Sequence, residues 1–414
     1  MTPRLRWLIR LVTRRLWFRA TLISLLAIAS ALISVVAAPY LPSGLSAKIG
    51  ADAVDTILQV IASSMLAVTT FSLSTMVAAY SGATEKVTPR ATRLLIDDPT
   101  AQNVLSTFVG SFLYSLVALI TLSAGAYGEA GRTILFVMTI GVVLLIVITL
   151  LRWIDYLLRF GRVGETVGTV EDAAAAAMRE RHENPFLGGT ELTGPAIVLP
   201  TARPVFPEYI GYIQHIDMQT LADTAAKASV NLYVRALPGT FVDRGRPLAM
   251  IGGGDEDVMD AVRIAFVIGK ERSFDQDPRF GLSVLAEIAS RALSPALNDA
   301  GTAIDVLGRG MRVLWIQAER KQPEETRYPD VFVPALQPAD LFDDLFGPIA
   351  RDGAAVVEVQ IRLQKTLQAL ARASDPRFAA EARRHARLAL KRALPALTLE
   401  EDRQRLEAAA IWSA

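Results

Sequence analysis

Residues 54–79 read VDTILQVIASSMLAVTTFSLSTMVAA, an apolar run whose one charged residue, Asp55, lies next to its start. A bilayer core of about 30 Å needs about 20 mainly apolar residues in a helix, so this run predicts a membrane-spanning helix. Three more runs of this kind lie at 20–38, 104–124 and 133–151. The sequence therefore predicts an integral, multi-pass membrane protein whose four spans form a helical bundle within residues 1–160.

The run at 20–38 has an alternative interpretation as a signal peptide, because the sequence VVAAPY at 35–40 offers small residues for cleavage. The apolar region of a signal peptide is only about 7–15 residues long. Residues 20–38 exceed this length, so we interpret them as the first span.

The basic residues that flank the four spans differ in number from loop to loop. In chain order they are Arg4, Arg6, Arg10, Arg14, Arg15 and Arg19 before the first span, Lys48 after it, Lys86, Arg90 and Arg93 after the second, Arg132 after the third, and Arg152, Arg159 and Arg162 after the fourth. Short cytoplasmic loops carry an excess of Lys and Arg. This rule predicts that both termini lie in the cytoplasm.

The second span carries a row of small and hydroxyl-bearing residues. Ser63, Ala67, Thr70, Ser74 and Ala78 are four, three, four and four positions apart, which places them on one helix face. Small residues on one face allow close helix packing in lipid. The same face could instead line a hydroxyl-rich path in a homo-oligomer. No span has a charged residue near its midpoint, which argues against a proton relay or an ion-coupled carrier.

The composition excludes several classes of chemistry. The chain has no Cys, so it has no disulfide and no thiolate ligand or nucleophile. Its three histidines, at 182, 215 and 385, lack metal-ligand spacing, and we expect neither a metal nor another cofactor. The formal net charge is +1 and no basic patch is interleaved with aromatic residues, so nucleic acid is not an expected partner.

The second half of the chain predicts a mostly helical α+β domain in the cytosol. Residues 161–207 read as a linker helix followed by a connection rich in Pro and Gly. Residues 208–254 alternate between strand and helix patterns and predict a small α+β unit, in which Asp217 is placed to cap a helix. From residue 255 to 414 the pattern is helical, and 339–373 reads as one long amphipathic segment.

Two polar breaks interrupt these helices. The first, at 271–279, contains Arg272, Asp275, Asp277 and Arg279, and the second, at 294–299, contains Asn298 and Asp299. Carboxylates beside Arg can bind a ligand, and the two breaks could meet in one site. They can equally tie loops together, and Asn298 or Asp299 can cap the helix that starts near residue 300. We favour loop pairing and capping.

Five stretches resemble a known bacterial family. They are IASSMLAVTTFSLSTMVAAYS at 61–81, TPRATRLLIDD at 88–98, GYIQHID at 211–217, PGTFVDRGRPLA at 238–249 and FDQDPRFGLSVLAEIASRALSPALNDAGTA at 274–303. Their order and content resemble the family called domain of unknown function 2254, described as predicted membrane proteins. This chain has Thr88 where the family often has Ser, and Ala300 where it often has Pro. The resemblance implies a multi-pass protein of the bacterial inner membrane, with four spans and a cytosolic domain, and it implies no activity.

These observations leave two functional hypotheses open. The first is a homo-oligomeric pore or channel whose path the second span lines and whose cytosolic domain gates or assembles it. The second is a membrane-anchored sensor or scaffold whose cytosolic domain binds a ligand or partner. The sequence contains no HExxH motif, P-loop or GxSxG elbow, so we do not expect an enzyme.

Overall fold

The computed structural model describes residues 13, 16–37, 51–96, 98–194, 200–319 and 326–413. The predicted end of the first span at residue 38 and most of the basic residues around that span lie outside these ranges. The chain divides into two compact units. We call Trp7–Glu85 with Thr92–Glu165 the membrane unit, and Lys86–Ala91 with Thr166–Ala414 the C-terminal unit.

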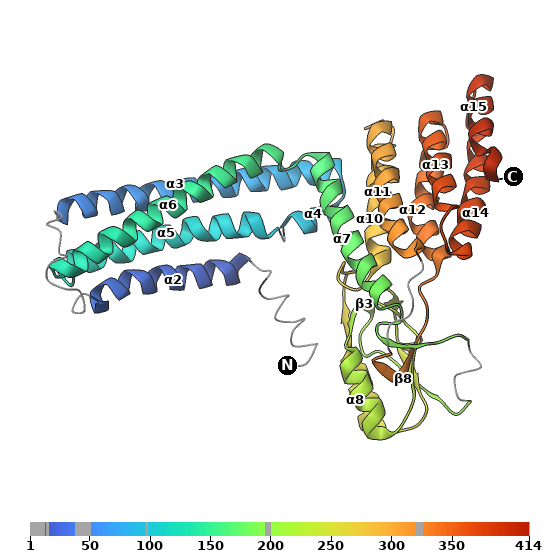
Figure 1. Ribbon diagram of the computed structural model, residues 1–414, viewed down its shortest axis with the longest axis horizontal. Coiled ribbons are helices and arrows are strands. Elements are labelled where there is room, and N and C mark those ends of the chain that lie inside the picture. Colours follow the sequence, from blue (N-terminus) through green and yellow to red (C-terminus); the bar gives the residue numbers. More distant parts are fainter. Residues whose placement is uncertain are drawn as a thin grey trace. The chain divides into compact units, whose positions relative to one another are not determined.

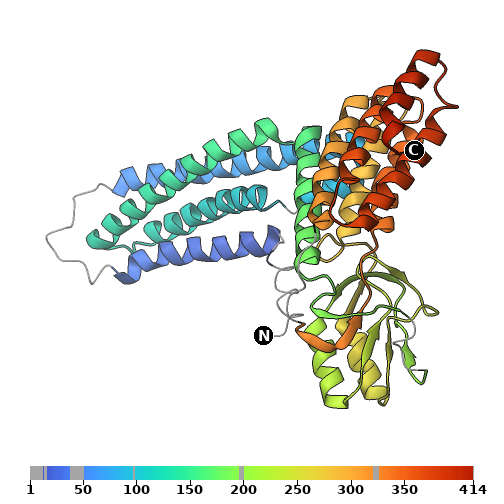
Figure 2. The ribbon, with the colours of Figure 1, turned by 45° about the vertical axis from the view of Figure 1, so that its right-hand side comes forward.

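The membrane unit consists of long helices that lie side by side (Figures 1 and 2). They are α2 (Leu16–Ala37), α3 (Ala51–Lys86), α5 (Pro99–Ser123) and α6 (Glu129–Arg159), with the short α4 (Pro89–Ile96) between α3 and α5. Among the described residues, three helical stretches are long and apolar enough to cross a membrane, namely Ala53–Gly82, Pro99–Ser123 and Gly131–Arg159. They coincide with the second, third and fourth predicted spans.

The first predicted span coincides with α2, whose apolar part within the described residues is the shorter Trp17–Ile33. α2 packs against α5 and α6. A Cβ added to Gly110 of α5 would lie 2.8 Å from Ile23 Cγ2, so glycine permits this close approach. The buried Tyr127 hydroxyl donates a hydrogen bond to the Ala31 carbonyl oxygen at 3.0 Å.

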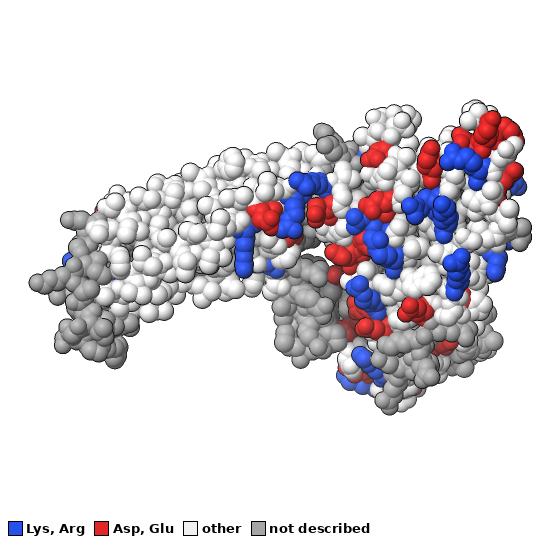
Figure 3. All heavy atoms as spheres, turned by 45° about the horizontal axis from the view of Figure 1, so that its top comes forward, with Lys and Arg blue, Asp and Glu red and all other residues white. Residues whose placement is uncertain are grey.

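The inner faces of α3, α5 and α6 form an apolar core around Met65, Phe108 and Trp153. Outside this core the membrane unit presents large exposed side chains such as Phe71 and Leu144. Figure 3 shows that Lys, Arg, Asp and Glu are absent from most of the length of these helices on the face drawn. An apolar exterior of this kind is suited to lipid rather than to water.

Besides Lys86–Ala91, the C-terminal unit contains α7 (Val163–Glu183) from Thr166 onward and two small sheets. The five-stranded sheet has the order β1-β8-β4-β6-β2 and the three-stranded sheet the order β5-β3-β7. The strands are β1 (Gly189–Glu191), β2 (Arg203–Val205), β3 (Gly211–Ile216), β4 (Leu232–Val234), β5 (Phe241–Val242), β6 (Ala249–Ile251), β7 (Phe266–Gly269) and β8 (Tyr328–Val333). Both sheets contribute to one apolar core with α8 (Met218–Ala228) and α9 (Glu256–Ala265).

The remaining helices of the C-terminal unit stack side by side (Figures 1 and 2). They are α10 (Pro278–Ala292), α11 (Ala300–Ala318), α12 (Pro338–Asp352), α13 (Val357–Leu370), α14 (Pro376–Ala393) and α15 (Glu400–Ala410), followed by the 3-10 turn η3 (Ile411–Ser413). The predicted cap of α8 is confirmed, because Asp217 accepts a hydrogen bond from the Thr220 amide.

Two predictions of secondary structure in this region need correction. The stretch 255–414, predicted as helical, contains two strands, β7 and β8. α9 stops at Ala265 because the β-branched and aromatic residues that follow pair with β3. β8 lies between β1 and β4 inside the larger sheet, a pairing that depends on strands far away in the chain. The predicted single segment 339–373 is two helices, since α12 ends at Asp352 and α13 starts at Val357.

Candidate functional site

The five residues predicted to share one face of the second span are all exposed in the membrane unit. Ser63, Ala67, Thr70, Ser74 and Ala78 point away from α5 and α6, whereas Ile61, Met65, Ser72 and Met76 of the opposite face are buried. Packing inside one chain therefore uses the other face of α3. The small and hydroxyl-bearing face remains available to a neighbour, to lipid or to water.

The hydroxyl groups on this face donate hydrogen bonds to the helix itself. Ser63 donates to the Gln59 carbonyl oxygen, Thr70 to that of Leu66, and Ser74 to that of Thr70, each at 3.0 Å. No hydroxyl donor on the face is left unsatisfied, which lowers the cost of placing it in a membrane. Each oxygen still has a lone pair that can accept a hydrogen bond or contact a cation.

The exposed face continues beyond the predicted residues. Thr56, Gln59 and Ser81 lie on the same side of α3 and are also exposed. Gln59 donates a hydrogen bond to Asp55 Oδ2 at 2.5 Å near the start of the helix. We call the exposed residues Thr56, Gln59, Ser63, Ala67, Thr70, Ser74, Ala78 and Ser81 the polar line of α3. The helical spacing of the sequence could have revealed its full length, because the same period continues at both ends.

In the C-terminal unit, Asp277 is the centre of the first polar break. It is buried, and its carboxylate accepts from Arg272 Nε at 2.7 Å and Arg272 Nη2 at 3.0 Å. It also accepts from the Phe280 amide at 3.1 Å and so caps α10. Burial raises the pKa of Asp277, while the charge of Arg272 acts in the opposite direction. Gly239 lies against this carboxylate with φ +87°, and a Cβ there would be 2.1 Å from Oδ2.

A second arginine, Arg181 of α7, lies near Asp277. It is 3% exposed, and its Nε and Nη1 have no hydrogen-bond partner among the residues that the structure describes. Burial lowers the pKa of Arg181 to about 10, with the charges of Asp277 and Glu180 opposing the shift. The guanidinium is therefore still charged at neutral pH, and Asp277 compensates charge for more than one arginine.

The other predicted residues of the two breaks have structural partners. Arg279 binds Asp344 through Nε at 2.7 Å and Asp340 through Nη1 at 2.8 Å. Asp275 accepts from the Ser273 hydroxyl at 3.1 Å. Asp299 caps α11 by accepting from the Thr302 amide and hydroxyl at 3.0 and 2.6 Å, which lowers the pKa of Asp299.

The two polar breaks do not come together. The first ends at the N-terminus of α10 and the second starts beyond its C-terminus, so the helix holds them about 22 Å apart. Asn298 lies in the turn after α10, with φ +46°. The described contacts of both breaks are those of loop pairing and helix capping.

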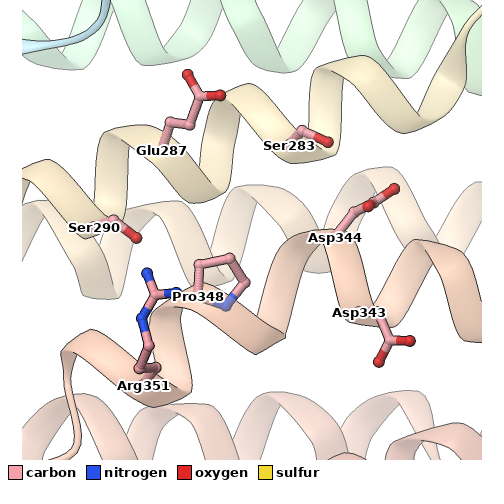
Figure 4. A pocket seen from close by; sticks show the side chains of 7 residues that line it. All are labelled: Ser283, Glu287, Ser290, Asp343, Asp344, Pro348 and Arg351. Atoms are coloured by element: carbon pink, nitrogen blue, oxygen red, sulfur yellow. The ribbon is translucent and has the colours of Figure 1, made fainter. Parts of the chain in front are cut away.

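A pocket that the sequence did not predict lies between α10 and α12 (Figure 4). Its volume is about 410 Å³, and it is lined by Ser283, Glu287, Ser290, Asp343, Asp344, Pro348 and Arg351. The three α10 residues are spaced four and three apart, so they share one face of a helix that is otherwise mainly apolar, a signal that was visible in the sequence. The volume is in the range of small-molecule sites. Within the described residues, no cluster of His, Asp and Glu is suited to a metal ion.

Asp343, which lines the pocket, also belongs to a charged group with Arg384 and His385. Arg384 Nη2 lies 2.8 Å from Asp343 Oδ1 and 3.0 Å from His385 Nε2, so the neutral imidazole can accept from the guanidinium. His385 is buried and packs against Phe342 and Phe346. Burial, together with the charge of Arg384, lowers the pKa of His385 to about 4.

His385 should make stability depend on pH. Its pKa is about 4 in the folded chain and about 6.5 in the unfolded chain, so between these values the unfolded chain binds more protons and stability falls as the pH falls. We expect a loss of about 2 kcal/mol between pH 7 and pH 5. Urea unfolding of the full chain in detergent measures it. A His385→Phe variant should lose correspondingly less stability over this interval, and an equal loss in both proteins would contradict the assignment.

Comparison with known proteins agrees with the apolar helices of the membrane unit. A family model described as predicted membrane protein (DUF2254) matches residues 13–369. Uncharacterized proteins of Mycobacterium bovis and Mycobacterium tuberculosis are 26% identical over 281 residues, which are 66% of this chain. The chain spans about half, 54%, of the length of these relatives. No solved structure matches the chain. The extent of the family match shows that the chain belongs to the DUF2254 family of predicted membrane proteins.

Proposed function

We propose that this protein forms a homo-oligomeric channel in the bacterial inner membrane, with the polar line of α3 facing a shared path. The observation that carries the proposal is the exposure of all five predicted residues on a helix whose other face is buried. In this proposal α2 serves as the first span, and the C-terminal unit assembles or gates the channel. The distribution of basic residues supports a cytoplasmic position for the C-terminal unit.

The chemistry of the polar line supports a path for water or ions. Its members are small or polar, and the larger exposed side chains Leu66, Phe71 and Leu73 lie to either side of it. A pore can select by its diameter and by the dipoles and hydrogen-bonding groups of its wall. Thr70 and Ser74 supply hydroxyl oxygens at the middle of the span. Charged groups at this depth would be costly, and the one charged residue of the span, Asp55, lies next to its start.

The proposed path requires more than one copy of the chain. A single α3 exposes the line on one side only, so one chain cannot enclose a path with it. Several copies arranged around an axis would bring their lines together, and the small residues would allow their backbones to approach closely. A dimer could instead pack through the same surface and enclose no path. The oligomeric state is therefore the first quantity to measure.

Leucine at the centre of the polar line should block the channel. In planar bilayers we expect the current of Thr70→Leu or Ser74→Leu to fall to less than about a tenth of wild type, because a hydrophobic constriction excludes water. Thr75→Leu is the matched control, since Thr75 lies about 100° around the helix from Ser74. It should conduct like wild type, and all variants should keep the wild-type oligomer size in detergent.

A silent wild-type bilayer with an intact oligomer would favour the second candidate, a membrane-anchored sensor or scaffold. The observation that supports this alternative is the pocket between α10 and α12. The next measurement would then be the melting temperature of the full-length protein against a panel of small metabolites, because a ligand that binds only the folded state raises it.

A further inference from the structure

The connection between α3 and α4 belongs to the C-terminal unit. Lys86–Ala91 groups with residues from Thr166 onward, although α3 before it and most of α4 after it belong to the membrane unit. Val87, Thr88 and Ala91 are 1%, 4% and 0% exposed. A loop between two spans is ordinarily solvated, so side chains this buried indicate a built attachment.

One α10 residue, Glu287, holds this connection through both carboxylate oxygens. Arg90 Nη1 donates to Oε1 at 2.6 Å, and the Thr88 hydroxyl is 3.3 Å from Oε2. The Arg90 amide donates to the Thr88 hydroxyl oxygen at 3.0 Å, which fixes the turn into α4. Pro89 at the first position of α4 further restricts the backbone. One carboxylate thus engages two residues of the same turn.

We infer that Glu287 is a latch residue, which fastens the end of α3 to α10 and transmits movement of the C-terminal unit to the polar line. The functional part of this inference rests on the proposed channel, whereas the latch itself does not. Lys86 is both the last residue of α3 and the first of the attached segment, so the backbone passes any displacement of the segment directly into the helix. Helical residues keep their mutual spacing, and a shift at Lys86 therefore reaches Ser74 and Thr70.

The position of Glu287 would also allow a ligand to regulate the latch. The same side chain lines the pocket between α10 and α12, where Figure 4 shows it on the α10 wall. Its partner Arg90 is 59% exposed in its side chain, so the ion pair can be screened and exchanged. A ligand in the pocket would therefore compete with Arg90 and Thr88 for the Glu287 carboxylate.

Hydrogen exchange of the full-length protein in lipid nanodiscs tests the latch. We expect Arg90→Glu and Glu287→Arg to raise amide exchange in the peptide containing residues 86–91 by about fivefold each, because attraction becomes repulsion. The double variant Arg90→Glu/Glu287→Arg should restore exchange to within about twofold of wild type. Arg291→Glu, one turn further along α10 and exposed, is the charge-matched control and should leave the peptide unchanged.

The salt dependence of amide exchange provides a second test of the latch, which requires no charge-reversed variant. At about 1 M salt the Debye length is about 3 Å, so exchange of this peptide should rise in wild type and change less in Glu287→Gln. Unchanged exchange in both single reversals, or no recovery in the double variant, overturns the latch. Currents recorded from the same proteins should change in open probability and not in unit conductance. A silent wild type would defeat the channel proposal while leaving the exchange result to decide the latch.

Discussion

Asp277→Ala is expected to lower the free energy of unfolding of the C-terminal unit by about 3–5 kcal/mol. The carboxylate is buried and binds Arg272 through two hydrogen bonds. Its removal leaves the charges of Arg272 and Arg181 without their nearest opposite charge. An uncompensated buried charge accounts for most of the expected cost, and the lost cap of α10 adds about 1 kcal/mol.

The measurement is urea unfolding of the full-length protein in mild detergent, followed by circular dichroism. Asp275→Ala provides the control, because Asp275 lies in the same break and is less buried. It should cost less than about 1 kcal/mol. Equal losses in the two variants would show that Asp277 is not the centre of the charged group. Asp277→Asn should lie between the two, since an amide can retain part of the cap without the charge.

A methyl group added at Gly281 is expected to cost about 2 kcal/mol or more, although alanine is the better helix former. A Cβ at this position in α10 would be 2.3 Å from the Ala174 Cβ and 2.7 Å from the Ala174 Cα of α7. The second of these atoms is backbone, so α7 and α10 must separate. Both helices bury mainly apolar side chains along their length, and separating the helices would weaken the packing of these side chains.

Gly308→Ala in α11 is the matched comparison. Nothing lies within 4 Å of a Cβ at Gly308, so only the helix preference for alanine acts there. We expect a gain of about 0.5–1 kcal/mol, opposite in sign to the effect at Gly281. Thermal unfolding of the two variants under one condition measures both. Destabilisation by Gly308→Ala, or stabilisation by Gly281→Ala, would contradict the helix contact.

Local rules predicted much of the fold. Three of the four predicted spans coincide with long apolar helices, because crossing a bilayer requires a continuous apolar run that is visible in one window. Helix caps at Asp217 and Asp299 could also be predicted from the sequence, because a capping side chain binds a backbone amide only three residues away. The five residues of the α3 face were identified from helical spacing alone.

Contacts between distant parts of the chain could not be predicted in this way. Asp340 and Asp344 bind Arg279 from 61 and 65 residues away, and Glu287 binds Arg90 from 197 residues away. β8 joins the larger sheet only through pairing with β1 and β4. Strand pairing of this kind depends on partners far apart in sequence, and so neither β7 nor β8 was expected.

The amino-acid order alone therefore established where helices can cross a membrane, which residues share a helix face and which side chains cap a helix, because each depends on neighbours within a turn or a span. Folding in three dimensions decided which face of α3 stays uncovered, which carboxylate compensates each arginine, and that the turn after α3 is attached to α10. These depend on the approach of segments up to 199 residues apart, and on which groups are thereby removed from solvent.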